Sequence, residues 1–555
     1  MSVVSCCAQK YHLKLEGISS TETQILDSLN YNKTHPTELS LQQEKTHTQL
    51  LLSKKGYLEN KEVSSKQTND SSFLSIISLG KKTKTIRLLL KSNSAVKKLI
   101  SNDKDSITIL YPLIEIFLTE QKTKLENAGF VLSIFKLSNL SKKEDILLGD
   151  LEITENDQKI IDKIQVVESN NQQTTFPIGH LKQINKQFKN TIVSQNNLNK
   201  ISEQFSKYNF AQQIKSPETL FTTDSTKVYV YLEKQNANSF DGFIGFNNNE
   251  SQKVRLSGYL DLQLQNILNT GEEFKLNWKS DGNNQRIFNT SLELPYLFKS
   301  PIGLKGQINI FKQDSTFQNT KTGIELSYFI KYNTRIYLGH ESTTSSDIQN
   351  SNTTTLSDFQ NNFITATFSY TKRDNENSIN PNKASTSLKL GYGRRESTSS
   401  QTNNNTAIQN YIELTTNYTF YLSQKNHIYL KGVFQDLNSK KYNLNELYRF
   451  GGIKSIRGFQ ENSLLAKTFF VLATEYRYLI NKNFYVNTVT DYAFFSIPKN
   501  SETNDYNTNT ISAGLGFSLQ TPTGLLRFSA VNNYSKDVKT NFYNTIIHFS
   551  YNVKF

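Results

Sequence analysis

The C-terminal part of the chain alternates between polar and apolar residues. From Ser239 onward, segments of roughly ten residues alternate in this way, as the strands of membrane barrels do, and turns rich in Asn, Ser, Thr, Asp and Gly separate them. Because successive side chains of a strand point to opposite faces, each segment predicts a strand with one apolar face. The sixteen predicted strands cover residues 240–246, 254–267, 273–279, 287–294, 304–311, 323–332, 334–340, 362–370, 387–394, 411–422, 427–437, 468–479, 483–495, 508–519, 524–531 and 545–555.

The last predicted strand shows the pattern most sharply. One of its faces carries Thr545, Ile547, Phe549, Tyr551, Val553 and Phe555, and the other face is mostly polar. An even number of such strands predicts a closed antiparallel transmembrane β-barrel over 239–555, because every strand edge in a bilayer must be paired. A soluble β-sandwich is the alternative, but the charged residues Glu475, Arg477, Asp491 and Arg527 on the second faces favour a wet lumen.

Three long polar segments connect predicted strands. They cover 341–355, 373–384 and 396–407 and are rich in Asn, Ser and Thr. We expect them to be extracellular loops, since polar surface loops of this kind rarely carry catalysis.

The first 236 residues follow a different, repeated order. Each repeat opens with a strand, continues through helical sequence to a Gly or Asn that is followed by an aromatic residue, and closes with strands. The opening strands are 11–16, 85–90 and 160–167, the helix ends are Gly56, Gly129 and Asn209, and closing strands are 73–79, 146–153 and 227–232. Gly and Asn tolerate the left-handed position that ends many helices. The pattern predicts three β-α-α-β-β modules, over 10–82, 83–157 and 158–236; one irregular α+β domain is the alternative.

Residues 1–9 look like the remnant of a signal peptide. Small residues end at Ala8, as before a cleavage site, although a basic start and most of an apolar core are missing. We expect the exported protein to begin at or near Gln9. A lipoprotein attached through Cys6 is the alternative.

Composition excludes several classes of protein. The chain has no apolar run near the ~18 residues that a membrane helix needs. Its net charge is +14, but the lysines are scattered and do not interleave with aromatic residues, so we expect no nucleic-acid partner. Cysteine occurs only at positions 6 and 7, which leaves no thiol chemistry for the rest of the chain.

Motifs of common enzymes are also missing from the sequence. His340-Glu341 is not followed by the second histidine of a zinc protease, and neither a Gly-x-Ser-x-Gly elbow nor a phosphate-binding loop occurs. We therefore expect no enzyme, no cofactor and no metal site.

A glycine-rich loop lies between the eleventh and twelfth predicted strands. Its candidate functional residues are Gly451, Gly452, Ile456, Arg457, Gly458 and Phe459. Glycine allows the backbone to take positive φ, which suits a loop folded back into the barrel. A buried Arg457 then needs carboxylates, and parity puts Asp491 and Glu475 on the inward faces of neighbouring strands, with Asp491 the first choice. The alternative is an ordinary turn that is exposed to water and has no functional contact.

With its N-terminal repeats, sixteen predicted strands and glycine-rich loop, the chain resembles the BamA/TamA superfamily of outer-membrane assembly proteins. Members join POTRA modules to a sixteen-stranded barrel of the surface-antigen type and carry an Arg-Gly-aromatic motif between strands eleven and twelve, like Arg457-Gly458-Phe459. Glu475-Tyr476-Arg477 and Asp491 resemble the family's inward residues on the next two strands. Phe549, Tyr551, Val553 and Phe555 resemble the family's C-terminal assembly signal. Stretches 238–243 and 258–262 are similar to Bacteroidetes-type members.

The resemblance implies a function in the Gram-negative outer membrane. Modules in the periplasm would receive unfolded outer-membrane protein clients, and the first and last barrel strands would form a lateral gate for insertion. Accessory periplasmic or lipoprotein subunits and outer-membrane lipid are the other implied partners. The alternative is a translocator of the two-partner-secretion type. A passive porin would leave the N-terminal repeats without a purpose.

Overall fold

A computed structural model describes residues 10–92, 94–154, 156–168, 176–248, 254–281, 285–349, 356–374, 382–397, 405–453, 455–498, 505–522, 524–535 and 545–554. The predicted signal remnant, residues 1–9, and the terminal Phe555 lie outside the described residues. By contacts, modules 1 and 2 belong to one compact unit, and most of module 3 groups with the barrel in the other.

The chain before the barrel forms three small mixed sheets with helices, which confirms the predicted fold class. Module 1 contains β1 (Tyr11–Gly17), α1 (Ser20–Asp27), β2 (Thr34–His35), α2 (Glu38–Lys54), β3 (Lys61–Asn69) and β4 (Ser72–Ser78). Module 2 contains β5 (Thr85–Lys91), α3 (Ser94–Ser101), β6 (Ser106–Leu110), a short 3-10 turn η1 (Tyr111–Leu113), α4 (Ile114–Asn127), β7 (Ile134–Lys143) and β8 (Ile146–Thr154). Module 3 contains β9 (Lys163–Glu168), α5 (Ile178–Phe188), α6 (Gln195–Phe205), β10 (Ala211–Phe221) and β11 (Thr226–Lys234). In the described residues, no helix is both long enough and apolar enough to cross a membrane.

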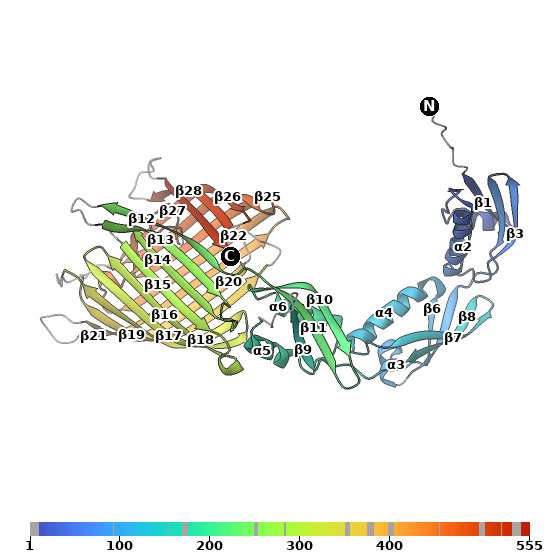
Figure 1. Cartoon of the computed structure of the whole chain (residues 1–555), viewed down its shortest axis with the longest axis horizontal. Helices are drawn as coiled ribbons and strands as arrows, with labels where there is room; N and C mark the ends of the chain where they lie inside the picture. The colour runs from blue at the N-terminus through green and yellow to red at the C-terminus, as the bar shows by residue number, and fades with distance from the viewer. Residues whose placement is uncertain are drawn as a thin grey trace, which may run out of the picture. The chain divides into compact units, whose positions relative to one another are not determined.

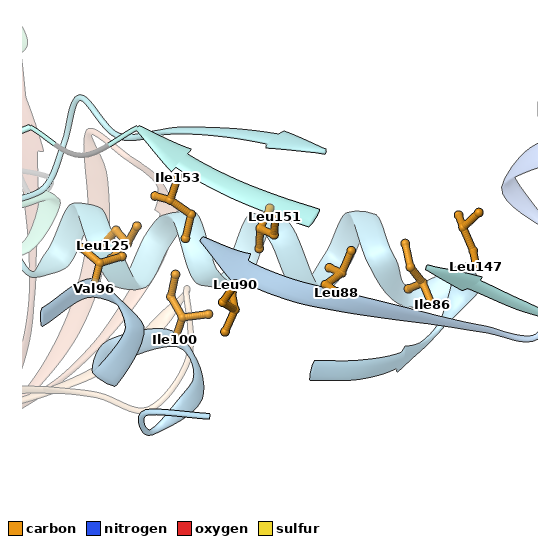
Figure 2. Close-up of a cluster of buried hydrophobic side chains, with 9 residues drawn as sticks. All are labelled: Ile86, Leu88, Leu90, Val96, Ile100, Leu125, Leu147, Leu151 and Ile153. Atoms are coloured by element: carbon orange, nitrogen blue, oxygen red, sulfur yellow. The ribbon is translucent and has the colours of Figure 1, made fainter. Parts of the chain in front are cut away.

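The opening and closing strands of each module lie side by side. β1 pairs with β4, β5 with β8 and β9 with β11, each time in parallel. Their alternate apolar residues face the helices, and Figure 2 shows this core in module 2, where Ile153 of β8 and Ile100 of α3 lie near Val96 and Leu125. Burying these aliphatic side chains is the main stabilisation available to so small a domain.

The helix ends show how one module passes to the next. α2 begins at a capping box between Thr37 and Ser40, which satisfies backbone N–H groups of its first turn. Gly56 and Gly129 end α2 and α4 with φ of 102° and 91°, as predicted. The carbonyl of Gly56 accepts a hydrogen bond from the N–H of Thr83, and that of Gly129 accepts one from Lys159, so both helix ends hold the following linker.

Two details of the modules differ from the prediction. Asn209 is not among the residues with positive φ, so the third helix end does not repeat the glycine geometry. Modules 1 and 2 also contain an extra edge strand between their helices, β2 and β6. Both strands are short and pair on one side only, which leaves too little periodicity to read from the sequence.

The rest of the chain closes into a sixteen-stranded antiparallel barrel, as predicted (Figure 1). Its strands are β12 (Ser239–Asn248), β13 (Val254–Gln265), β14 (Glu273–Asp281), β15 (Gln285–Leu294), β16 (Ile302–Gln313), β17 (Phe317–Lys331), β18 (Thr334–Asp347), β19 (Phe359–Arg373), β20 (Asn382–Ser397), β21 (Asn405–Tyr421), β22 (Asn426–Ser439), β25 (Thr468–Asn481), β26 (Phe484–Ile497), β27 (Tyr506–Gln520), β28 (Gly524–Ser535) and β29 (Ile546–Lys554). All sixteen match the predicted segments in order.

Several strands are longer than their alternating pattern. β18, for example, continues past His340 through a Ser- and Thr-rich stretch to Asp347, still paired with β17 and β19. Backbone hydrogen bonds can extend a sheet into water, where the outward face no longer needs apolar residues. The apolar alternation therefore marks the part of each strand that faces lipid, and not the whole strand.

The two faces of the barrel wall differ in chemistry. Leu326, Leu338 and Ile364 point outward and are exposed, whereas Glu325 and Glu341 point inward and are buried. Lys305 lies 3.1 Å from Glu325, and lysines of two other strands pair with Glu341. Paired charges inside and aliphatic side chains outside are the arrangement of a barrel in lipid, which excludes the soluble sandwich.

One predicted loop lies at the other end of the barrel. β19 ends at Arg373 and β20 begins at Asn382 at the end of the barrel where Tyr332 and Asn333 join β17 to β18, which is the end next to module 3. Residues 375–381 between these strands lie outside the described residues. The strands that lead into the other two predicted loops, 341–355 and 396–407, end at the opposite end of the barrel. The three segments therefore do not share one end of the barrel, as their common assignment requires, because composition does not record which end of the barrel a loop occupies.

The seam between the first and last strands is short. Only Ser239 and Phe240 of β12 pair with β29, opposite Lys554 and Val553. By contrast, every residue of β12 pairs with β13. Over most of this seam, the described edges of β12 and β29 have no strand partner.

Candidate functional site

The loop between β22 and β25, residues 440–467, lies inside the barrel. It contains a 3-10 turn, η3 (Leu444–Glu446), and a small hairpin of β23 (Tyr448–Phe450) and β24 (Leu464–Ala466). Gly451 and Gly452 follow β23 with φ of 115° and 89°. The left-handed backbone turns the chain sharply there, and the N–H of Gly452 donates to the carbonyl of Ile456 over 2.9 Å.

An apolar cluster attaches the loop to the barrel wall. Ile456 has no exposed surface and packs with Phe450 and with Val471 and Phe495 of the wall, and Phe459 packs at the cluster's edge. The rings of Phe450 and Phe469 stack with centroids 4.3 Å apart and planes 7° apart. These contacts bury the apolar side chains that flank Arg457, so the guanidinium is drawn away from bulk water.

Arg457 is enclosed by two carboxylates. Its Nε and Nη2 donate to the two oxygens of Asp491 over 2.8 and 2.6 Å, and its backbone N–H donates to the same carboxylate over 3.0 Å. Nη1 donates to Glu475. Asp491 has no exposed surface and Arg457 is 7% exposed. The bidentate geometry uses the planar fork of arginine, which lysine lacks.

A second arginine continues the network. Nε of Arg477 donates to Glu475 over 2.7 Å, so this carboxylate lies between two guanidinium groups. Arg477 also lies over the ring of Tyr429, 4.2 Å from its centroid, and near Tyr485. The structure thus brings together the four charged residues that the sequence singled out, on β25, β26 and the loop.

Gly458 fits the loop against β27 and β28, the strands that follow β26 in the wall. Its φ is +83°, and a Cβ there would lie 3.3 Å from atoms of Ser512, Val531 and Asn532. The side-chain amide of Asn533 donates to its carbonyl over 2.5 Å.

We expect Gly458→Ala to lower barrel stability by about 1–2 kcal/mol, because an L-residue is strained at this φ and its methyl group presses on β27 and β28. The midpoint of the heat-induced gel shift of the purified barrel measures this. Gly306→Ala is the matched control, since a Cβ at Gly306 meets no atom within 4 Å. Equal midpoints for the two variants would contradict the packing of Gly458.

Other contacts of the loop were not found from the sequence. Lys279 of β14 pairs with Glu461, and Arg395 of β20 pairs with Glu446. Arg449 lies over the rings of Phe311 and Phe317, about 5 Å from each centroid. These partners are far apart in the sequence and meet only across the barrel, so no local pattern could have identified them. Together they fasten the loop to strands around the lumen.

The lumen holds a polar chamber of about 1430 Å³. It is lined by Ser206 and Asn209 of module 3, by inward residues of many strands, and by Ser455 and Arg457 of the loop. Both signs of charge line it, which suits water and polar backbone more than one small ligand. Among the described residues, no three His, Cys, Asp or Glu side chains are placed to share a metal ion.

An aromatic cluster joins module 3 to the turns of the barrel. His180 of α5 packs edge-on against Tyr296 with centroids 4.6 Å apart, and it contacts Tyr208 and Tyr332. Gly271 lies so close that a Cβ there would be 2.0 Å from the imidazole. His180 is fully buried, and neither ring nitrogen has a hydrogen-bond partner in the described part of the chain. A lone histidine in the sequence gave no sign of this role.

Burial lowers the pKa of His180 from 6.5 to about 3, and the charge of Arg335 adds to the effect. The docked histidine is therefore neutral, and a released one takes up a proton below pH 6.5. The contribution of His180 to the docking free energy of module 3 is fully present above that pH. It is lost as the pH falls toward 3, by about 2 kcal/mol between pH 7 and 5.

Hydrogen exchange of α5 in the full-length protein at pH 7 and pH 5 measures this loss. We expect faster exchange at pH 5 in the wild type and little pH response in His180→Leu, beyond intrinsic exchange. His47→Leu, at an exposed position, is the control and should behave like the wild type. A pH response of His180→Leu as large as that of the wild type would contradict the prediction.

The C-terminal strand presents its two faces as the sequence predicts. Ile547 and Phe549 are 64% and 65% exposed on the outer face, whereas His548 and Ser550 line the lumen. Tyr551 contacts Thr521 through its hydroxyl, and Val553 pairs with Phe240 and Gly524. A role of these residues as an assembly signal stays a prediction.

Comparison with known proteins gives one family match. Residues 266–550 match the Omp85 superfamily domain. Among solved structures, BamA from Haemophilus ducreyi lacking POTRA domains 1–3 is 15% identical with a TM-score of 0.49, over 85% of this chain and 99% of that chain. CdiB from Acinetobacter baumannii is 14% identical with a TM-score of 0.49, over 93% and 98%. CdiB from Escherichia coli is 11% identical with a TM-score of 0.48, over the same shares. A search of curated proteins finds no match.

Proposed function

Because the chain belongs to the Omp85 superfamily, we propose that it assembles other proteins of the outer membrane. In this proposal the N-terminal modules receive an unfolded β-barrel client, and the client enters the bilayer through an opening between the first and last barrel strands. The barrel lies in the outer membrane, and we place the three modules, with boundaries at 10–82, 83–157 and 158–236, in the periplasm.

The short seam between β12 and β29 carries the proposal. Beyond Ser239 and Phe240, the described edges of the two strands present backbone N–H and C=O groups without a strand partner. Such groups are costly in lipid, and a client strand that pairs with them satisfies both its own backbone and the edge. Insertion then needs no cofactor, since burial of apolar strand faces in lipid drives it.

The lumen loop supports a lateral route over a route through the barrel. It is fastened to β14, β20, β25 and β26 by ion pairs, and to the wall by the apolar cluster around Ile456. A polypeptide crossing the lumen would have to break these contacts. We infer that the Arg457 network holds the loop in place and thereby stabilises the working barrel.

The modules offer sheet edges for clients. In module 1 the outer strand β3 is exposed along its whole length, and in module 2 β7 is the outer strand beside β8. An extended peptide can add to such an edge by main-chain hydrogen bonds. We propose that unfolded clients bind in this way, and that accessory subunits of the periplasm use the same modules.

Depletion of the protein in its own cell tests the function. We expect many outer-membrane barrels to decrease together in the quantified proteome, while inner-membrane proteins are unchanged. Loss of one exported protein only, with the other barrels at normal level, would overturn the proposal and identify a dedicated translocator.

A further inference from the structure

Three lysines lie on one exposed face of α5 and at its end. Lys182, Lys186 and Lys189 are exposed, and their spacing of about one helical turn puts them on the same side as Ile178, which is 62% exposed. The helix contains no acidic residue. Among the described residues, none of these lysines makes an ion pair.

The neighbouring barrel turn has an unusual apolar tip. Residues Leu297–Lys299 form a 3-10 turn, η2, between β15 and β16, in which Phe298 is 97% exposed. Tyr296, Phe298 and Lys299 all take positive φ, near 50–60°. A left-handed backbone at bulky residues is strained, and such strain is typical of functional positions. An aromatic side chain held out in this way is unfavourable in water.

A second turn repeats the pattern. Between β13 and β14, Ile267 and Leu268 are 52% and 71% exposed. The acidic residue of this turn, Glu272, is buried and accepts hydrogen bonds from the backbone N–H of Leu268 and from Thr270. The turn therefore presents apolar side chains without an exposed negative charge.

The helix and the two turns form one continuous surface. The side-chain amide of Gln183 donates to the carbonyl of Lys299 over 2.7 Å, and His180 packs on Tyr296 and against Gly271. We call this surface the basic collar, and it comprises Ile178, Lys182, Lys186, Lys189, Ile267, Leu268, Phe298 and Lys299.

The collar continues the lipid-facing surface of the barrel. On the strands that enter η2, Leu292 and Ile302 point outward and are 42% and 45% exposed, and Tyr328 lies opposite Ile302. The apolar outer face thus runs to the very end of β15 and β16. Phe298 follows in η2 directly after this apolar end, and Gln183 of α5 contacts the same turn at Lys299.

We propose that the basic collar binds anionic phospholipid headgroups of the leaflet on the module side. The exposed aromatic and aliphatic tips enter the interface, and the lysines face the phosphates, the combination by which peripheral helices bind membranes. Because His180 fixes α5 to the same turns, the lipid contact holds module 3 at the barrel mouth. This inference rests on the barrel's place in a membrane and not on client assembly.

Hydrogen exchange of the full-length protein in nanodiscs tests the lipid contact. A lysine beside an anionic leaflet shifts the equilibrium roughly five-fold, so with two or more lysines engaged we expect exchange over 178–189 to slow at least about ten-fold when phosphatidylglycerol is added to phosphatidylethanolamine. K182E/K186E should lose this effect. K163E/K200E, the same charge change at exposed lysines of module 3 outside the collar, should keep it.

A tryptophan reporter tests the apolar tip separately. The chain has a single tryptophan, Trp278, so F298W/W278F reports only on η2. We expect its fluorescence to be quenched by lipids brominated in the upper acyl chain at least about two-fold more than by aqueous iodide. Protection of α5 without phosphatidylglycerol, competition by soluble phosphate, or iodide quenching as strong as for free tryptophan would each overturn the proposal. Protection that needs a second protein would assign the collar to a protein partner instead.

Discussion

Arg457→Ala is expected to destabilise the barrel by about 3–5 kcal/mol, because it leaves Asp491 and Glu475 buried without their cation. Truncation removes the four hydrogen bonds that the guanidinium donates and leaves only the backbone N–H of residue 457 as a donor to Asp491. The heat-induced gel shift of the purified protein should move to lower temperature, and client assembly should fall by an order of magnitude or more. Arg457→Lys should rescue little, since one ammonium group cannot bridge two carboxylates in a plane.

A double-mutant cycle separates this pair from general loop damage. With Asp491→Asn as the second change, the double variant should be clearly less destabilised than the sum of the single variants. Arg394→Ala is the control, because that arginine side chain is 65% exposed and its ion pair with Glu396 contributes little. Additive effects, or a silent Arg457→Ala, would show that the contact does not hold the loop.

A disulfide across the seam is expected to stop client assembly. Extending the observed pairing by one residue puts Asp241 opposite Asn552, and both line the lumen. In a C6S/C7S background, D241C/N552C should form a disulfide on oxidation, and assembly should fall at least about ten-fold because the edges can no longer part. Reduction should restore it.

The chain offers a matched control for this disulfide. Asp261 of β13 and Asn277 of β14 are directly opposite each other in a seam that is already fully paired. D261C/N277C repeats the same chemistry, so oxidation should leave assembly unchanged. Equal activity of the two oxidised variants would contradict a lateral gate between β12 and β29.

The barrel could be predicted from the sequence because its strands carry a physical signal. Lipid on one side and water on the other enforce a period of two, which gives all sixteen strands in order. The signal ends where lipid ends, so the polar extension of β18 to Asp347 was missed. The edge strands β2 and β6 were missed because they pair on one side and are short.

The candidate site was predictable only where parity along neighbouring strands suffices. Asp491 and Glu475 follow from the inward face of two adjacent strands, and the structure places both on Arg457. Contacts across the lumen, such as Lys279 with Glu461, depend on the curvature and stagger of the whole barrel. The buried His180 depends on how module 3 meets the turns, which no periodicity encodes.

Reconstitution of the purified full-length protein into liposomes tests the central claim most directly. An unfolded barrel client is added from urea, and its folded, heat-modifiable form is measured against empty liposomes. We expect several-fold more folded client with the protein present, and none of this gain with oxidised D241C/N552C. A yield equal to that of empty liposomes, or client delivered across the bilayer without insertion, would contradict assembly through the seam.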